Sequence, residues 1–122
     1  MAYSNLGNYV QAEEALKKVL SRDPQDAAVR ALLADTYLQA KRFPEAAAMY
    51  KEMVTASPND SRVWNNYGAA LNGAGQQAQA AAALETAVRL DPTFKQAWSN
   101  LGNLYQSMGD SAKASAAFAN AR

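Results

Sequence analysis

Apolar and small residues recur along the whole chain with the period of an α-helix. Trp64, Tyr67, Gly68 and Leu71 stand at i, i+3, i+4 and i+7, a spacing that places them on one face of a helix. This pattern predicts one set of helices near 27–40, 61–74 and 95–108. A second set alternates with the first, near 9–22, 43–57, 77–90 and 111–122, after a short piece of helix around Tyr3 and Leu6.

The pattern repeats at an interval of 34 residues. Pro24, Pro58 and Pro92 are spaced at this interval, and each proline is expected to end a helix because its ring disfavours the α conformation in the preceding residue. A fixed period of this length indicates a repeat architecture. Other residues fall into columns at the same interval: Trp64 and Trp98; Leu33, Tyr67 and Leu101; Ala34, Gly68 and Gly102; Tyr37, Leu71 and Tyr105; Ala12, Ala46, Ala80 and Ala114; Leu16, Tyr50, Leu84 and Phe118; Gly7, Lys41, Gly75 and Gly109.

These columns resemble the tetratricopeptide repeat, a helix–turn–helix with the pattern W..LG..Y, then A...F, then P. The fourth unit reads WSNLGNLY and the third reads WNNYGAAL, whereas the second has Arg30 in place of the tryptophan. The resemblance covers essentially the whole chain. It implies an all-α, right-handed α-solenoid of about three and a half repeats in a single domain, with units 1–26 (partial), 27–60, 61–94 and 95–122 (partial).

Helix ends and chain ends carry further signals. Asp26 and Asp60 stand where they could cap the helices that follow, and Pro44 stands in a first helical turn, where proline is tolerated. Terminal repeats normally have a polar outer face, but the last predicted helix carries Phe118 among alanines. We therefore expect a fragment of a longer array, or a homo-oligomer formed through the terminal helices.

The composition lacks the residue types on which most enzymatic catalysis depends. The chain has no His and no Cys, so the commonest general base, the thiol nucleophile and the commonest transition-metal ligands are missing. Twelve Lys+Arg against 11 Asp+Glu leave a net charge of +1, which gives no reason to expect nucleic acid or an anionic membrane as a partner. No segment approaches the roughly 20 consecutive apolar residues of a membrane span, and residues 1–10 do not resemble a secretory signal. We expect a soluble, cytoplasmic protein that is not an enzyme and uses no cofactor or metal.

Two clusters could suggest chemistry, but each has a simpler interpretation. Glu13 and Glu14 precede Lys17 and Lys18 by four residues, the spacing of charge pairs on a solvated helix face. The tryptophans and tyrosines could stack on bases or sugars, but their place in the repeat columns indicates core packing.

In tetratricopeptide arrays the first helix of each unit lines an inner groove, so the resemblance implies that the positions outside the signature face a ligand there. In this chain most of these positions are neutral amides. The candidate peptide-binding residues are Arg62, Asn65, Asn66 and Asn72 in the third unit, and Gln96, Ser99, Asn100, Asn103 and Gln106 in the fourth. The second unit contributes Ala28, Ala31, Leu32, Asp35 and Gln39.

Asn66 and Asn100 are one repeat apart. An amide carries both donors and acceptors, which matches the N–H and C=O groups of an extended peptide backbone. The arrangement resembles the peptide-holding repeats of O-linked N-acetylglucosamine transferases, although Leu32 interrupts the column. Asparagine costs several tenths of a kcal/mol in a helix relative to alanine, so these positions ask for a reason. A role in binding the peptide backbone and a merely solvated helix face are the two interpretations.

The resemblance also allows a test of a second binding mode. Chaperone-binding tetratricopeptide domains hold a C-terminal carboxylate with a clamp of Lys, Arg and Asn. Ala31 and Asp35 stand where that clamp needs Lys and Asn, and Gln96 and Asn100 where it needs basic residues, so we exclude this mode.

We predict a protein–protein interaction module that binds an extended peptide. The alternatives are a structural scaffold that assembles through its open ends, and the substrate-recruiting part of a larger enzyme such as a glycosyltransferase.

Overall fold

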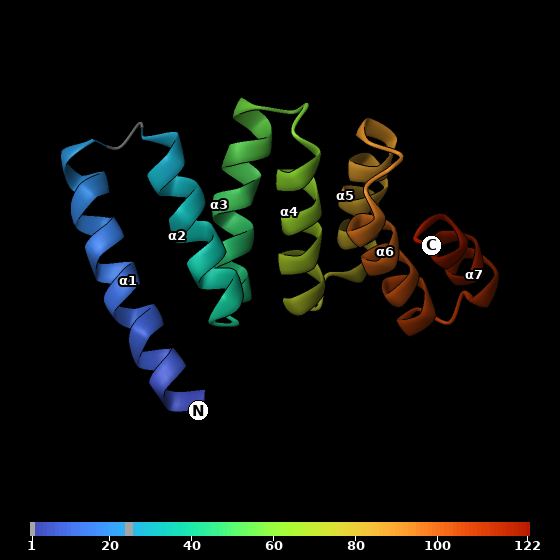
Figure 1. Cartoon of the computed structure of the whole chain (residues 1–122), viewed down its shortest axis with the longest axis horizontal. Helices are drawn as coiled ribbons and strands as arrows, with labels where there is room; N and C mark the ends of the chain where they lie inside the picture. The colour runs from blue at the N-terminus through green and yellow to red at the C-terminus, as the bar shows by residue number, and fades with distance from the viewer. Residues whose placement is uncertain (1, 24–25) are drawn as a thin grey trace.

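The computed structural model describes residues 2–23 and 26–122, with side chains from Val10 onward. The described residues form helices only, which lie side by side in chain order (Figure 1). The helices are α1 (Ala2–Arg22), α2 (Ala27–Gln39), α3 (Phe43–Ala56), α4 (Ser61–Gly73), α5 (Gln77–Leu90), α6 (Lys95–Ser107) and α7 (Ser111–Asn120). The predicted all-α solenoid is confirmed.

Aspartates begin three of the helices. The side chains of Asp26, Asp60 and Asp110 accept hydrogen bonds from backbone N–H groups in the first turns of α2, α4 and α7, groups that have no partner within the helix. The capping roles predicted for Asp26 and Asp60 are confirmed. Pro44 stands in the first turn of α3, as expected from its position, because the missing N–H is not needed there.

The predicted break near Gly7 is wrong, because α1 is one continuous helix. In the three later hairpins, the residue of this column adopts a positive φ in the turn: 63° at Lys41, 83° at Gly75 and 84° at Gly109. Because α1 makes no turn at Gly7, the backbone groups on both sides of Gly7 belong to one helix, Ala2–Arg22.

Small residues allow the two helices of each hairpin to approach closely. A β-carbon on Gly68 would lie 2.6 Å from Cγ of Leu84, and one on Gly102 would lie 2.7 Å from Cε1 of Phe118. The sequence suggested that Phe118 is an uncovered apolar side chain on the last helix, and this expectation is wrong. Phe118 is partly buried and packs into the last hairpin.

The tryptophans belong to the core, as predicted. Trp64 and Trp98 pack against the larger apolar cluster. Their indole N–H groups donate to the carbonyl oxygens of Pro58 and Pro92 at 2.7 Å. Each tryptophan thus ties the start of a first helix to the turn that precedes it.

Contacts between non-consecutive helices show which side of the array is the inner one. Helix α2 contacts α4, and α4 contacts α6, whereas among the described helices α3, α5 and α7 make no such contacts with one another. The first helices of the units are therefore closer together, which places them on the inner side of the curved array. None of the described helices has the length and apolar character needed to span a bilayer.

Candidate peptide-binding face

The inner face is formed by α2, α4 and α6, and it carries the predicted site residues at three different depths. Five of them are exposed and three are partly buried. The exposed ones are Arg62, Asn72, Gln96, Asn103 and Gln106, and the partly buried ones are Asn66, Ser99 and Asn100. The remaining one, Asn65, is only 2% exposed.

Asn65 and Asn100 are bonded to each other. The side-chain N–H of Asn100 donates to Oδ1 of Asn65 at 2.9 Å, which links α4 to α6. Asn65 is thus a structural link between two units, and a contact between Asn65 and a peptide would require this bond to open. The bond uses one N–H of Asn100, so the second N–H and the amide oxygen of Asn100 remain as groups that could bind a ligand.

A cavity of about 460 Å³ lies next to Asn66, between α2 and α4 and over α3. One part of its lining is apolar and consists of Ala27, Ala28, Ala31, Met53, Ala56 and Val63. The other part is polar and consists of Arg30, Asp35, Tyr50, Ser57, Asp60, Arg62 and Asn66. We call it the α2–α4 cavity. Sequence reasoning placed five of these residues on the inner face, namely Ala28, Ala31, Asp35, Arg62 and Asn66. It did not foresee the cavity, whose one signal was Arg30 in the tryptophan column.

The charged groups around the α2–α4 cavity differ in how they are engaged. The hydroxyl of Tyr50 donates to Asp35, and burial together with this bond raises the pKa of Tyr50 far above its usual range. A guanidinium N–H of Arg30 donates to Glu52 at 2.5 Å. The side chain of Arg62, by contrast, is 83% exposed, and its contact with Asp60 is at 4.0 Å.

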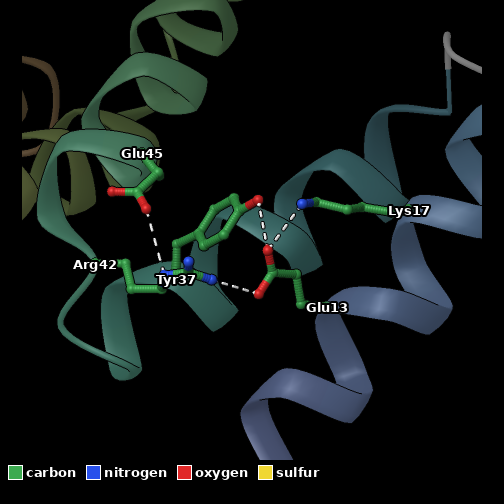
Figure 2. A network of polar contacts seen from close by, with 5 residues as sticks. All are labelled: Glu13, Lys17, Tyr37, Arg42 and Glu45. Atoms are coloured by element: carbon green, nitrogen blue, oxygen red, sulfur yellow. Dashed lines mark hydrogen bonds and ion pairs between the residues drawn. The ribbon is translucent and has the colours of Figure 1, made fainter.

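A second polar cluster joins α1 to the following hairpin (Figure 2). Glu13 accepts hydrogen bonds from the hydroxyl of Tyr37 at 3.1 Å and from Arg42 at 2.6 Å, and it pairs with Lys17 at 2.9 Å. Lys17 and Arg42 also lie 5.9 and 5.6 Å from the centre of the Tyr37 ring, within the range of cation–π attraction. Arg42 further contacts Glu45 at 3.3 Å.

This cluster corrects the interpretation of Glu13 as a solvated surface charge. The pair with Lys17 exists, but Glu13 itself is 9% exposed. The hydrogen bond from Lys17, followed by those from Tyr37 and the charge of Arg42, lowers the pKa of Glu13 despite its desolvation. A carboxylate held by three donors is a structural anchor for α1. Its partners at Tyr37 and Arg42 are 24 and 29 residues away, so no local motif could reveal it.

Comparisons with known proteins agree with this architecture. A family model described as tetratricopeptide repeat matches residues 6–69, and one described as TPR repeat matches residues 68–109. MamA from Desulfovibrio magneticus RS-1 (residues 41 to its end) is 28% identical, with a TM-score of 0.90 over 98% of this chain and 68% of that one.

Two further MamA structures show the same likeness. The one from AMB-1 is 25% identical, with a TM-score of 0.83 over 98% of this chain and 71% of that one. The one from MSR-1 shares the fold at 24% identity, with a TM-score of 0.84 over 98% and 69% of the two chains. A sequence search of curated proteins finds no match. The repeat columns, the paired helices and the family matches together show that the chain belongs to the tetratricopeptide repeat family.

Proposed function

We propose that the inner face binds an extended peptide segment of a partner protein, and that side-chain amides on α4 and α6 hold its main chain. Members of the tetratricopeptide repeat family are protein-interaction modules, and solenoids bind through extended concave surfaces. The proposal assigns this role in particular to Asn66, Asn100, Asn103 and Gln106.

The observation that carries the proposal is the position of Asn66 and Asn100. They occupy the same place in two successive units, on helices that contact each other. Each offers a donor and an acceptor to a peptide unit. A segment lying across α4 and α6 would therefore meet the same chemical group twice.

The charge of the face supports a main-chain contact over an ionic clamp. Arg62 is the one charged residue among the nine candidate residues. Binding through neutral amides should change little with ionic strength, whereas contacts between exposed charges weaken as salt screens them. The salt dependence of binding therefore tests the proposal.

The test begins with peptides selected from a random 12-residue library displayed on phage, with the whole chain as bait. Asn66→Ala combined with Asn103→Ala removes two amides without disturbing the bond between Asn65 and Asn100. Each lost hydrogen bond should cost about 0.5–1.5 kcal/mol, so the double variant should bind a selected peptide about five- to hundredfold more weakly.

Gln79→Ala, at an exposed position of α5, is the matched control and should bind as wild type does. If the double variant also keeps full affinity, or if binding to Arg62→Gln, which removes the one charged candidate residue, falls steeply between 50 and 500 mM salt, the amide mechanism is wrong.

One observation favours a second function, assembly of copies through the end of the array. Ala81 of α5 is buried in the cluster that α5 shares with α6. Ser115, one repeat later on α7, is exposed. Light scattering on wild type and on Ser115→Arg distinguishes the two functions, because end-to-end assembly predicts a concentration-dependent mass that the variant abolishes. A constant monomer mass would exclude it.

A further inference from the structure

The α2–α4 cavity exists because the second unit departs from the third at three positions. Arg30, Ala31 and Asp60 line the cavity. One repeat later the same positions hold Trp64, Asn65 and Phe94. There Trp64 and Phe94 pack against the core cluster, and Asn65 is buried. The second unit thus has two small or short side chains and an arginine bonded to Glu52 where the third unit has bulky packed groups.

Arg30 leaves the cavity open because its guanidinium is engaged elsewhere. It donates to Glu52 of α3 at 2.5 Å. The apolar side chains of Ala28, Ala31, Met53 and Val63 therefore line space that no group of the second unit fills. The volume of about 460 Å³ falls within the range of pockets that bind ligands, roughly 300–1,000 Å³.

The lining contains two arginines and two aspartates, and its most exposed donor is the guanidinium of Arg62. Of the two carboxylates in the lining, Asp35 accepts the hydroxyl of Tyr50 and Asp60 accepts the backbone N–H of Arg62. Arg62 is 83% exposed, and its carboxylate contact is at 4.0 Å. An incoming carboxylate can form a closer pair with Arg62, since good charge-assisted hydrogen bonds are about 2.7–2.9 Å long.

We propose that the α2–α4 cavity anchors one apolar side chain of the bound segment, and that Arg62 pairs with an acidic residue beside it. The occupant is then an extended segment of another protein in which Leu, Ile, Met or Phe adjoins Asp or Glu. This inference rests on the proposed function, because Asn66 lines the cavity and a main chain held by Asn66 passes its mouth. The amides thus hold the backbone, and the cavity selects the sequence.

Two variants fill the cavity and one serves as the matched control. Ala31→Leu places three more carbons inside it. Ala28→Leu does so from an exposed position in the first turn of α2, where a larger side chain does not strain the core. Ala48→Leu makes the same change on the exposed surface of α3, outside the cavity lining. Thermal unfolding followed by circular dichroism shows that each variant is folded before it is used.

The experiment repeats the 12-residue phage selection on wild type, Ala31→Leu and Ala48→Leu, followed by fluorescence-polarisation titration of the enriched peptides. Wild type and Ala48→Leu should enrich peptides with an apolar residue next to Asp or Glu. Ala31→Leu and Ala28→Leu should bind these peptides at least tenfold more weakly, as should wild type when the apolar residue of the peptide becomes Ser. Exchanging the acidic residue for its amide should weaken binding to wild type several-fold and leave binding to Arg62→Gln unchanged.

The outcomes distinguish a failure of the apolar anchor from a failure of the proposed peptide binding through amides. Enriched peptides with no shared apolar residue, or equal binding by the filled variants, overturn the anchor. If the double variant Asn66→Ala, Asn103→Ala still binds those peptides more weakly than wild type does, the proposed amide contacts hold and only the apolar anchor is wrong. If wild type enriches no peptide, both proposals fall.

Discussion

Asn100 of α6 donates a hydrogen bond to Oδ1 of Asn65 of α4, and Asn65 is almost fully buried. The stability cost of breaking this hydrogen bond depends on which of the two asparagines is replaced. Loss of the donor leaves a buried oxygen unpaired, whereas loss of the acceptor leaves a partly exposed amide that water can reach. The link therefore bears on the stability of the array as well as on the proposed peptide contact of Asn100.

Asn100→Ala should lower the free energy of unfolding by about 1–3 kcal/mol, the cost of leaving a buried acceptor unsatisfied. Urea denaturation followed by circular dichroism measures the loss. Asn103→Ala, an exposed change on the same helix, should stay within about 0.5 kcal/mol of wild type. Equal effects of the two variants would mean that the inter-unit bond contributes nothing to stability.

Lys41→Gly should stabilise the fold by about 0.5–1 kcal/mol. Lys41 has a φ of 63°, in the column where Gly75 and Gly109 adopt 83° and 84°, and glycine adopts such angles without the steric cost of a β-carbon. Thermal unfolding is the measurement, with Lys41→Ala as its control. Because alanine keeps the β-carbon, a gain as large as that of glycine would point to the lysine charge and not to the backbone.

Trp98→Ala should cost about 3–5 kcal/mol, as large-to-small changes of core aromatics do. It removes both the packing against the core cluster and the bond from the indole to the carbonyl of Pro92. Trp98→Phe keeps most of the packing and should recover more than half of the loss. Both values come from urea unfolding curves, and an unchanged midpoint for Trp98→Ala would remove this residue from the core.

Glu13→Gln should destabilise the chain at neutral pH by about 1–3 kcal/mol, because hydrogen bonds to charged groups contribute that much. The pKa of Glu13 is lowered in the fold, chiefly by the hydrogen bond from Lys17. Its contribution is therefore present above the unfolded-state pKa of about 4.3 and is lost as the pH falls through the lower folded-state pKa.

Unfolding by urea at pH 7, 5 and 3 tests this dependence. The gap between wild type and Glu13→Gln should be full at pH 7 and should narrow at pH 3. Glu14→Gln, exposed on the same helix, should show only a small effect at each pH. A gap for Glu13→Gln that does not change with pH would show that ionisation of Glu13 is not what stabilises the cluster.

The 34-residue period predicted the helices after residue 26 almost to the residue, because each column is a packing requirement. A small residue at Gly102 and a bulky one at Phe118, for example, have to meet in one hairpin. The site was less predictable. Asn65 and Asn66 are neighbours in sequence, and one is buried while the other lines a cavity. Which of the two is buried depends on the approach of α6, and a single helix does not encode that approach.

The α2–α4 cavity and the Glu13 cluster escaped prediction for a related reason. Each is assembled from three successive elements, and its charged members are ordinary surface residues when each segment is considered alone. Arg30 and Glu13 gain their roles only from partners on other helices. For the cavity, the departure from the repeat pattern at Arg30 was the one signal in the sequence.

The direct contact between α4 and α6 also sets a length scale for any bound segment. Packed helices have axes about 8–10 Å apart, and a chain in the polyproline II conformation advances about 3.1 Å per residue with three residues per turn. One turn of such a chain therefore matches the step from one first helix to the next. Side chains of a β-strand alternate every two residues, so a strand would turn opposite edges toward Asn66 and Asn100. Under the proposed function, the spacing of the first helices therefore favours a bound segment in which every third residue faces the array.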